Sequence, residues 1–428
     1  MSTPAILGQL VLGHSPLIAR DRSVIATRLT VFPEKRDESP DAAALLQALM
    51  HVWPAPADAA TISLNLRAMP GQAPGAAADA APVAPTKATP LTLNIASEPW
   101  LRAMLAVQPP PHVMLEVPAF MVGDPVHAAA LQALHAAGSA LIVKGRPVTE
   151  LPRELLPCFR HSLIDAAEDR RGGGSQPPEG VARRISHIQV GVRTLAELDA
   201  AFARGAVGVL GWPIEDEFRR GSVQAGGPDL AVVTELIKRV DREEPVDKLE
   251  AVLKNDPQLA FRLIRYLNSA AFGLSVEVSS FQHALMMLGY QKLKRWLALL
   301  LASSSKDPQM KPAMFAAVRR GLLMEELVRH SADDEMRGEM FICGVFSLLD
   351  RMLGQDFATL FESVPVPDRV QQALVAGGGP FHPYLQLVRA MEQGVRGDIR
   401  DAADTAFVSL TEANAALLRA LASARELD

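Results

Sequence analysis

Side chains that could carry out chemistry are scattered through this sequence and form no familiar local motif. None of the ten histidines is followed by aspartate and no two stand at HxxxH spacing, so the local patterns of zinc sites and of paired His-Asp metal sites are missing. His127 and His135 could share one helix face, but their Ala-rich surroundings favour a plain helix. The chain also lacks a GxxxxGK[ST] phosphate loop and a GxSxG nucleophile elbow. No local motif therefore predicts an enzyme.

Composition narrows the class of protein and its surroundings. The chain has 428 residues, and 43 Lys and Arg against 48 Asp and Glu give a net charge of −5, which argues against nucleic acid as a general partner. Its two cysteines, Cys158 and Cys343, lie far apart, so a disulfide framework is not implied. The first residues do not resemble a signal peptide, and the longest apolar stretch, 296–302, is too short to cross a membrane. We expect a cytoplasmic, soluble protein that needs no membrane partner.

The positions of proline and of short apolar runs divide the chain into two parts. Only eight of the 32 prolines follow residue 228. Before that point, β-branched runs alternate with helical segments, which is typical of an α/β barrel or a doubly wound sheet with buried parallel strands. Thr194, with Glu197 three residues later, should cap one of these helices. The expected strands are 6–11, 24–31, 91–95, 113–117, 139–143, 185–190 and 205–210, and the expected helices are 41–50, 125–138 and 194–205.

Stretches rich in Ala, Pro and Gly indicate an insertion and the domain boundary. Residues 67–90 are rich in Ala and Pro, cannot build a core and are expected to form a flexible insertion. The Gly-rich stretch 219–230 is the expected interdomain connection. We predict a barrel domain over 1–220 and an all-α domain over 221–428. The helical runs expected there are 281–288, which Gly289 should end, then 293–305, 312–330, 337–353, 366–376, 381–393 and 408–425.

One stretch of the second part carries a specific family resemblance. It contains Asp256-Pro257, then Leu267-Asn268-Ser269 with Phe272-Gly273, then Val278-Ser279-Ser280, and finally Ala284 with Leu288-Gly289. In this order and spacing the elements resemble the HDOD domain, an all-helical relative of the HD phosphohydrolases. The likeness extends over about residues 228–410. It implies a domain that contacts signalling partners.

The residues of that stretch allow two interpretations. Asn268 can bond the free backbone groups of a helix end, and Gly273 can supply a left-handed residue, so a structural role is favoured. The alternative makes Asn268, Ser269 and Phe272 contact residues for a partner or ligand. Where an HD phosphohydrolase would carry its His-Asp pair, this chain has Ser347-Leu348, which cannot bind a metal ion. We therefore expect no catalysis in the second part.

The first part resembles an EAL domain, with important departures. Gln9, Asn94, Glu116, Asp165 and Gly211 carry the resemblance over about residues 5–220. It implies a TIM-type barrel that, in active members, hydrolyses cyclic di-GMP with metal ions. The sites of such barrels lie at the C-terminal ends of the strands, where Asn94 and Glu116 fall.

The departures affect the metal-binding carboxylates of that family. Arg28 stands where the Glu of the signature Glu-Ala-Leu is expected, and Val143-Lys144 replaces the paired Asp-Asp. The vestigial positions Asn94 and Glu116 cannot alone hold two divalent ions and a charged dinucleotide. We therefore expect a degenerate EAL-like barrel with no cofactor and no catalytic residue.

Three functions remain in view. The leading one is a non-catalytic regulatory protein of signal transduction, in which the barrel senses or scaffolds and the HDOD-like domain contacts partner proteins. The alternatives are a cyclic di-GMP phosphodiesterase and a receptor that binds cyclic di-GMP without hydrolysing it. A hydrolysis assay and a binding assay would separate them.

Overall fold

The structure is a computed structural model, and two compact units emerge from its contacts. One unit comprises Met1–Asp216 with Ala390–Arg400, and the other comprises Glu217–Arg389 with Asp401–Asp428. The first unit thus includes a short segment that the sequence prediction placed in the all-α domain. The residues described are 4–35, 38–53, 90–110, 112–145, 147, 150–167, 185–216, 230–246, 248–249, 252, 281–302, 308–330, 333–364 and 366–425.

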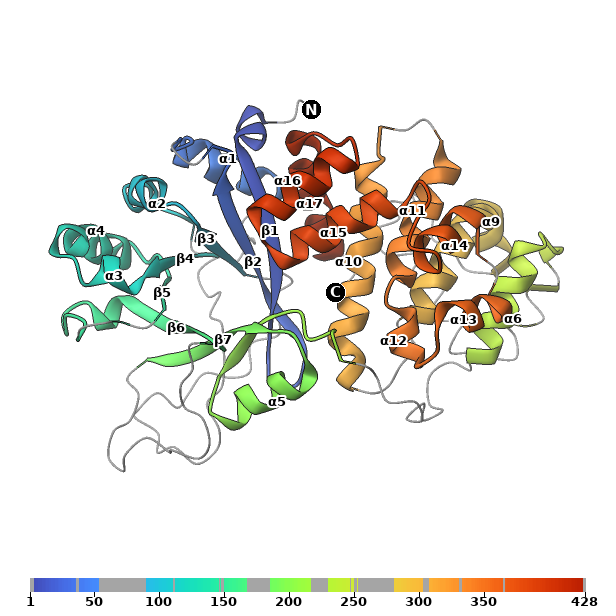
Figure 1. The fold of residues 1–428 in the computed structure, drawn as a ribbon, viewed down its shortest axis with the longest axis horizontal. Coiled ribbons are helices and arrows are strands. Elements are labelled where there is room, and N and C mark those ends of the chain that lie inside the picture. The colour runs from blue at the N-terminus through green and yellow to red at the C-terminus, as the bar shows by residue number, and fades with distance from the viewer. Residues whose placement is uncertain are drawn as a thin grey trace. The chain divides into compact units, whose positions relative to one another are not determined.

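The first unit contains a closed eight-stranded barrel (Figure 1). Its strands follow the chain order around the barrel, and every neighbouring pair from β2 to β8 is parallel. The strands are β1 (Leu10–Ile18), β2 (Val24–Pro33), β3 (Leu91–Ile95), β4 (Val113–Pro118), β5 (Leu141–Lys144), β6 (Phe159–Asp165), β7 (Ser186–Val192) and β8 (Gly208–Gly211). The α/β barrel that the sequence favoured is confirmed, and the doubly wound sheet is excluded.

The first strand departs from the prediction. Residues Ala5–Gln9 form a short 3-10 helix, η1, so the expected strand over 6–11 begins only at Leu10. The strand is also antiparallel to both β2 and β8, where a parallel strand was expected. The cause is the tight turn after Ile18, where Ala19 and Ser23 share a backbone hydrogen bond of 2.9 Å, because so short a connection can join only antiparallel strands.

Other elements of this unit match the sequence closely. The Thr194–Glu197 capping box is present at the start of α5, as predicted. Strand β6 was missed because its polar residues interrupt the apolar run. Nearly all of the expected insertion over 67–90 lies outside the described residues. The helices are α1 (Ala42–Val52), α2 (Glu98–Leu105), α3 (Ala119–Val122), α4 (Pro125–Ala136), α5 (Leu195–Ala203) and the one-turn η3 (Leu156–Cys158).

An apolar layer fills the interior of the barrel below the C-terminal ends of strands β2 to β8. Side chains from seven of the eight strands meet there and are almost fully buried, as expected for a barrel whose interior is packed core. This layer is a floor, and in the parallel strands β2 to β8 the residues two positions further along lie above it on the same side of the sheet. The floor consists of Leu17, Ala26, Met114, Ile142, Leu163, Ile188 and Leu210.

After residue 229, the described residues form helices and connections without a strand. The predicted all-α character is therefore confirmed for this part of the chain. Gly289 interrupts α9 with a φ of 67°, a backbone conformation that glycine adopts readily. The helices are α6 (Leu230–Asp241), α9 (Phe281–Ala302), η5 (Pro308–Met310), α10 (Lys311–Leu327), α11 (Asp334–Phe346), α12 (Leu349–Leu353), α13 (Phe357–Ser363), α14 (Asp368–Leu374), α15 (His382–Gln393), α16 (Arg396–Thr405) and α17 (Leu410–Arg425).

Helices α10 and α11 pack closely through two glycines. A Cβ atom added to Gly344 would lie 2.5 Å from the backbone carbonyl of Arg320 and 2.6 Å from the Cα of Gly321. Only glycine permits two helix backbones to approach to this distance. None of the helices in the described part of the chain is both long and apolar enough to span a membrane.

Candidate functional site

The strand period brings five polar side chains together inside the barrel. Ala26, Met114 and Ile142 belong to the apolar floor, and Arg28, Glu116 and Lys144 follow each of them by two residues. Alternation along a strand therefore places these three charges on the interior side, above the floor and toward the C-terminal ends of the strands. Strand β3 adds Thr92 and Asn94, which pair in register with Arg28 and Thr30 of β2. We call Arg28, Thr92, Asn94, Glu116 and Lys144 the mouth cluster.

The centre of the mouth cluster is an ion pair between Arg28 and Glu116. The guanidinium donates from Nε to Oε1 at 2.8 Å and from Nη2 to Oε2 at 2.6 Å, so one flat fork holds both carboxylate oxygens. Thr92 Oγ1 donates a third hydrogen bond to Oε1 at 3.3 Å. The side chain of Glu116 is completely enclosed, whereas that of Arg28 remains 11% exposed.

The other half of the mouth cluster is built on Lys144. Its Nζ donates to Asn94 Oδ1 at 2.9 Å, and Asn94 Nδ2 donates to Thr30 Oγ1 at 3.3 Å. Burial lowers the pKa of Lys144; the Glu116 carboxylate opposes this change, and the Arg28 guanidinium adds to it. Lys144 is therefore electrostatically linked to both members of the central ion pair.

The mouth cluster does not fit a catalytic pair of divalent ions. Metal ions of this kind need several free carboxylate or carbonyl oxygens. Both oxygens of Glu116 already face Arg28, and Lys144 supplies a second cation within the same group. A magnesium or manganese ion would have to displace one cation and approach the other.

Asp165 does not complete a ligand set. Its carboxylate turns toward its own loop, where Oδ1 accepts from the backbone N–H of Ala167 at 2.8 Å and the side chain lies beside Gly191. Across the described ranges, no group of three or more His, Cys, Asp or Glu side chains is placed to hold a metal ion.

The structure brings together residues that the sequence prediction considered for separate reasons. Asn94 and Glu116 were predicted as vestigial positions and Arg28 and Lys144 as departures, and all four lie in one hydrogen-bonded group. The direct pairing of Arg28 with Glu116 was not predicted. A period-two count from the apolar floor would have placed both on the barrel interior, and opposite charges there must pair.

In the helical part, Ser347 occupies the place expected for the His of a His-Asp pair. Its hydroxyl donates to the carbonyl oxygen of Gly344 at 2.7 Å and accepts from Arg320 Nη1 at 3.1 Å. Ser347 is buried at the end of α11, and Leu348 beside it is buried as well. Here too an arginine lies beside a position where a metalloenzyme would need a ligand.

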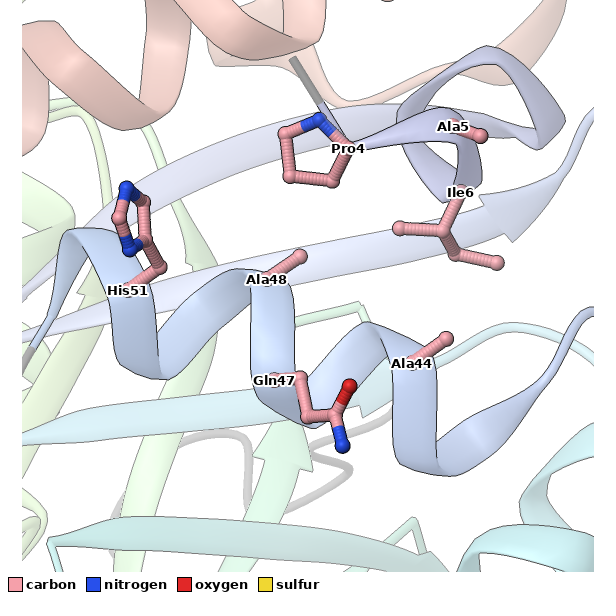
Figure 2. Close-up of a pocket in the computed structure, with 7 residues that line it drawn as sticks. All are labelled: Pro4, Ala5, Ile6, Ala44, Gln47, Ala48 and His51. Atoms are coloured by element: carbon pink, nitrogen blue, oxygen red, sulfur yellow. The ribbon is translucent and has the colours of Figure 1, made fainter. Parts of the chain in front are cut away.

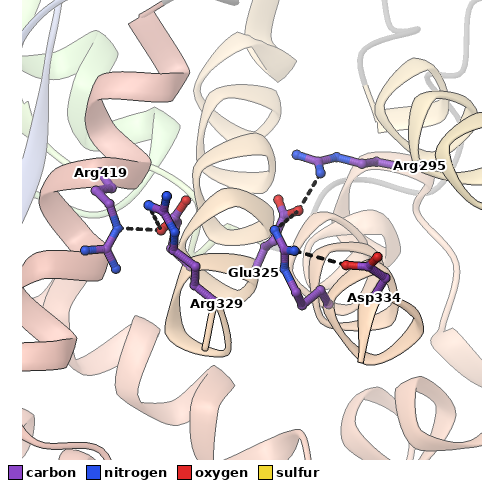
Figure 3. A network of polar contacts seen from close by, with 7 residues as sticks. Arg295, Glu325, Arg329, Asp334 and Arg419 are labelled. Atoms are coloured by element: carbon purple, nitrogen blue, oxygen red, sulfur yellow. Dashed lines mark hydrogen bonds and ion pairs between the residues drawn. The ribbon is translucent and has the colours of Figure 1, made fainter. Parts of the chain in front are cut away.

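Adjacent acidic side chains on α10 form a second polar group, which Figure 3 shows. Arg295 Nη1 lies 2.5 Å from Glu325 Oε1, and Arg419 Nε lies 2.6 Å from Glu326 Oε2. Arg337 lies 3.9 Å from Glu325. Because arginines from α9, α11 and α17 surround the two carboxylates, this network ties helices together and offers no metal site.

Three basic residues stand close together at Lys292, Lys294 and Arg295, and two of them form ion pairs. Lys294 Nζ lies 2.5 Å from Asp241 Oδ1, and Arg295 binds Glu325 as described. Lys292 is exposed, and the apolar neighbours on this helix, Leu293 and Trp296, are buried. The arrangement matches an exposed helix flank and not a phosphate site. The candidate residues Asn268, Ser269, Phe272 and Gly273 lie outside the described residues.

A surface cavity of about 310 Å³ lies between η1 and α1 (Figure 2). Its lining is mainly small and apolar, and His51 and Gln47 are its only polar side chains. Such a lining brings no group of titratable side chains together, since His51 is the one titratable residue in it. The lining residues are Pro4, Ala5, Ile6, Ala44, Gln47, Ala48 and His51.

Comparison with known proteins identifies a domain of a known family in the helical part. Residues 228–355 match the family model of the HDOD domain. The chain is similar to the uncharacterized protein YuxH of Bacillus subtilis, at 29% identity over 166 residues, which are 37% of this chain and 39% of the relative. It is also similar to the cyclic di-GMP phosphodiesterase CdgJ of Vibrio cholerae, at 29% identity over 168 residues, which are 39% of each chain. The matches thus span about two fifths of each relative's length. Residues 228–355 of this chain therefore contain an HDOD domain.

Proposed function

We propose that this protein is a non-catalytic component of signal transduction related to cyclic di-GMP. In this proposal the barrel is a degenerate EAL-like domain that senses or scaffolds, and the HDOD domain contacts partner proteins. Support for the signalling class comes from the HDOD match and from the similarity to CdgJ, a protein named as a cyclic di-GMP phosphodiesterase. The charges inside the barrel support the absence of catalysis.

The observation that carries the proposal is the ion pair between Arg28 and Glu116. A metal-dependent hydrolase must leave its carboxylates free to hold an ion that activates water. In this barrel the guanidinium covers both oxygens of the enclosed carboxylate, and Lys144 contributes a second positive charge. Arg320 beside Ser347 supports the same conclusion for the helical part.

A cyclic di-GMP phosphodiesterase is the second candidate, because one relative carries that name. Incubating the full chain with cyclic di-GMP and either magnesium or manganese ions separates the two candidates. We expect product formation no faster than in the blank without protein. An active EAL phosphodiesterase, assayed in parallel, confirms that substrate and metal are competent. Hydrolysis well above the blank would overturn the proposal.

The receptor alternative needs a separate measurement. Equilibrium binding of labelled cyclic di-GMP to the full chain tests whether the dinucleotide is recognised without being cleaved. Saturable binding without hydrolysis would identify the barrel as a cyclic di-GMP sensor. If the chain does not bind the dinucleotide, the barrel acts as a scaffold in this proposal, and protein contacts carry the signal.

A further inference from the structure

Positive charge dominates the part of the mouth cluster that solvent reaches. The cluster holds two cations, Arg28 and Lys144, and one carboxylate, Glu116. The carboxylate is completely enclosed, but the Arg28 side chain is 11% exposed and Lys144 is half-buried. A ligand that enters this end of the barrel therefore meets ammonium and guanidinium groups before any carboxylate.

Both cations keep donors for a further acceptor. An ammonium group has three N–H donors and a guanidinium has five. Among the described residues, Lys144 Nζ donates to Asn94 Oδ1, and Arg28 directs its Nε and Nη2 donors to Glu116. Asp165, another acidic side chain near the strand ends, bonds its own loop. Two donors of Lys144 and the Nη1 group of Arg28 therefore remain for an acceptor from outside this set.

We infer that the mouth cluster is a binding site for an anionic oxygen group, a phosphate or a carboxylate, held directly by Lys144 and Arg28 without a divalent metal ion. The inference rests on the proposed non-catalytic role, because these two cations take the place of the metal ions. An oxyanion supplies acceptors for the remaining donors, and charge-assisted hydrogen bonds of this kind are the strong ones. It also supplies the negative charge that the cluster lacks, which would raise the lowered pKa of Lys144.

Lys144→Gln is the variant that tests this site. It removes the charge but keeps an amide donor that can still reach Asn94, so the barrel should stay folded. The matched control is Lys35→Gln, which removes an exposed lysine of the same unit that pairs with Glu38 at 2.9 Å. Asn94→Asp is the second variant, because a carboxylate beside Lys144 would neutralise the ammonium without changing the shape of the site.

The experiment is isothermal titration calorimetry of the full chain with inorganic phosphate and, separately, with succinate, both in the presence of EDTA. We expect saturable binding of at least one anion, with a Kd raised about tenfold or more by Lys144→Gln and by Asn94→Asp but unchanged by Lys35→Gln. The anion with the lower Kd separates a phosphate ligand from a carboxylate ligand. Thermal melting without ligand checks that each variant is folded.

Two results would overturn the inference. One is the absence of saturable binding of either anion by the wild-type chain. The other is binding that folded Lys144→Gln and Asn94→Asp retain at wild-type affinity. Because EDTA removes divalent ions, neither result bears on hydrolysis, which is measured separately. Failure of this inference therefore leaves the proposed function intact, and hydrolysis of cyclic di-GMP would overturn the proposed function whether or not anions bind.

Discussion

A buried carboxylate in a protein interior is stable only with a partner, and Glu116 shows this requirement at the scale of one residue. Its side chain has no exposure, and its two oxygens accept three hydrogen bonds from Arg28 and Thr92. Removing one member of such a pair leaves an uncompensated buried charge, which costs more than the pair itself contributes. We therefore expect Arg28 to stabilise the barrel, in addition to its proposed effect on metal binding.

Arg28→Met should lower the free energy of unfolding of the barrel by about 3–5 kcal/mol. Chemical denaturation of the full chain, followed by circular dichroism, measures the change. The control Arg102→Met breaks the exposed pair with Glu98, which should cost less than about 1 kcal/mol. The double variant Arg28→Met/Glu116→Leu should recover part of the lost stability. An Arg28→Met chain as stable as the wild type would contradict this role.

His161 should make the barrel sensitive to mild acid. Burial, with a smaller effect of Arg160, lowers the pKa of His161 to about 4, and its Nδ1 lies 2.7 Å from Ser186 Oγ. The unfolded chain, whose histidine has its ordinary pKa near 6.5, takes up the proton first. The stability due to neutral His161 is therefore present above about pH 6.5 and is lost as the pH falls toward 4, by about 3 kcal/mol in all.

The test is the free energy of unfolding measured at several pH values between 7 and 4. His161→Gln should flatten the acid side of this profile, because the variant has no proton to take up at that position. His135→Gln, at an exposed histidine of α4, should leave the profile unchanged. Equal slopes for His161→Gln and the wild type would refute the assignment.

At the scale of elements, the contact between α10 and α11 depends on glycine. A Cβ atom at Gly344 would lie 2.5 Å from backbone atoms of Arg320, which cannot move without shifting the helix. On the same helix α11, a Cβ atom at Gly338 would have no neighbour within 4 Å. The two glycines therefore have opposite roles, although the sequence alone does not distinguish them.

Alanine at these two positions should change stability in opposite directions. Gly344→Ala should destabilise the helical part by about 1–3 kcal/mol through overpacking. Gly338→Ala should be neutral or stabilise it by up to about 1 kcal/mol, because alanine has the higher helix propensity. Thermal unfolding of the full chain measures both. A Gly344→Ala chain that melts with or above Gly338→Ala would rule out the close helix contact.

Elements with a strong period were predictable from sequence, and elements set by the connecting turns were not. Apolar β-branched runs located β3 and β4 almost residue by residue, and Thr194 with Glu197 marked the start of α5. The direction of β1 was wrong because it depends on a tight turn and not on the composition of the strand. Strand β6 was missed because polar residues interrupt the apolar residues along it.

The candidate site was predictable in its parts but not in its pairing. The sequence identified Asn94, Glu116, Arg28 and Lys144 as the informative positions. Which of them touch depends on strand register, since Arg28 and Glu116 are 88 residues apart and come from strands that are not neighbours. Register around a closed barrel is a property of the whole sheet, so no local pattern encodes it.

At the scale of the whole molecule, composition predicts where the chain is open to proteases. Residues 67–90 and 219–230 combine Ala, Pro and Gly with few side chains that could be buried. Limited proteolysis of the native chain, analysed by mass spectrometry, should give first cuts in these two segments. Segments inside the helices, such as Leu410–Arg425, should be cleaved much later. First cuts within the barrel strands or these helices would contradict the two-domain prediction.

The central claim is that the barrel holds no divalent metal ion at Glu116, and a difference measurement tests it most directly. Electron paramagnetic resonance of free manganese ions gives the number of ions bound per full-length chain. The reference is Glu116→Gln, which removes the carboxylate charge but keeps an oxygen for Arg28. The account predicts equal manganese binding by the two proteins. A wild-type chain that binds one more manganese ion than Glu116→Gln would contradict the claim and restore the barrel as a candidate metal-dependent hydrolase.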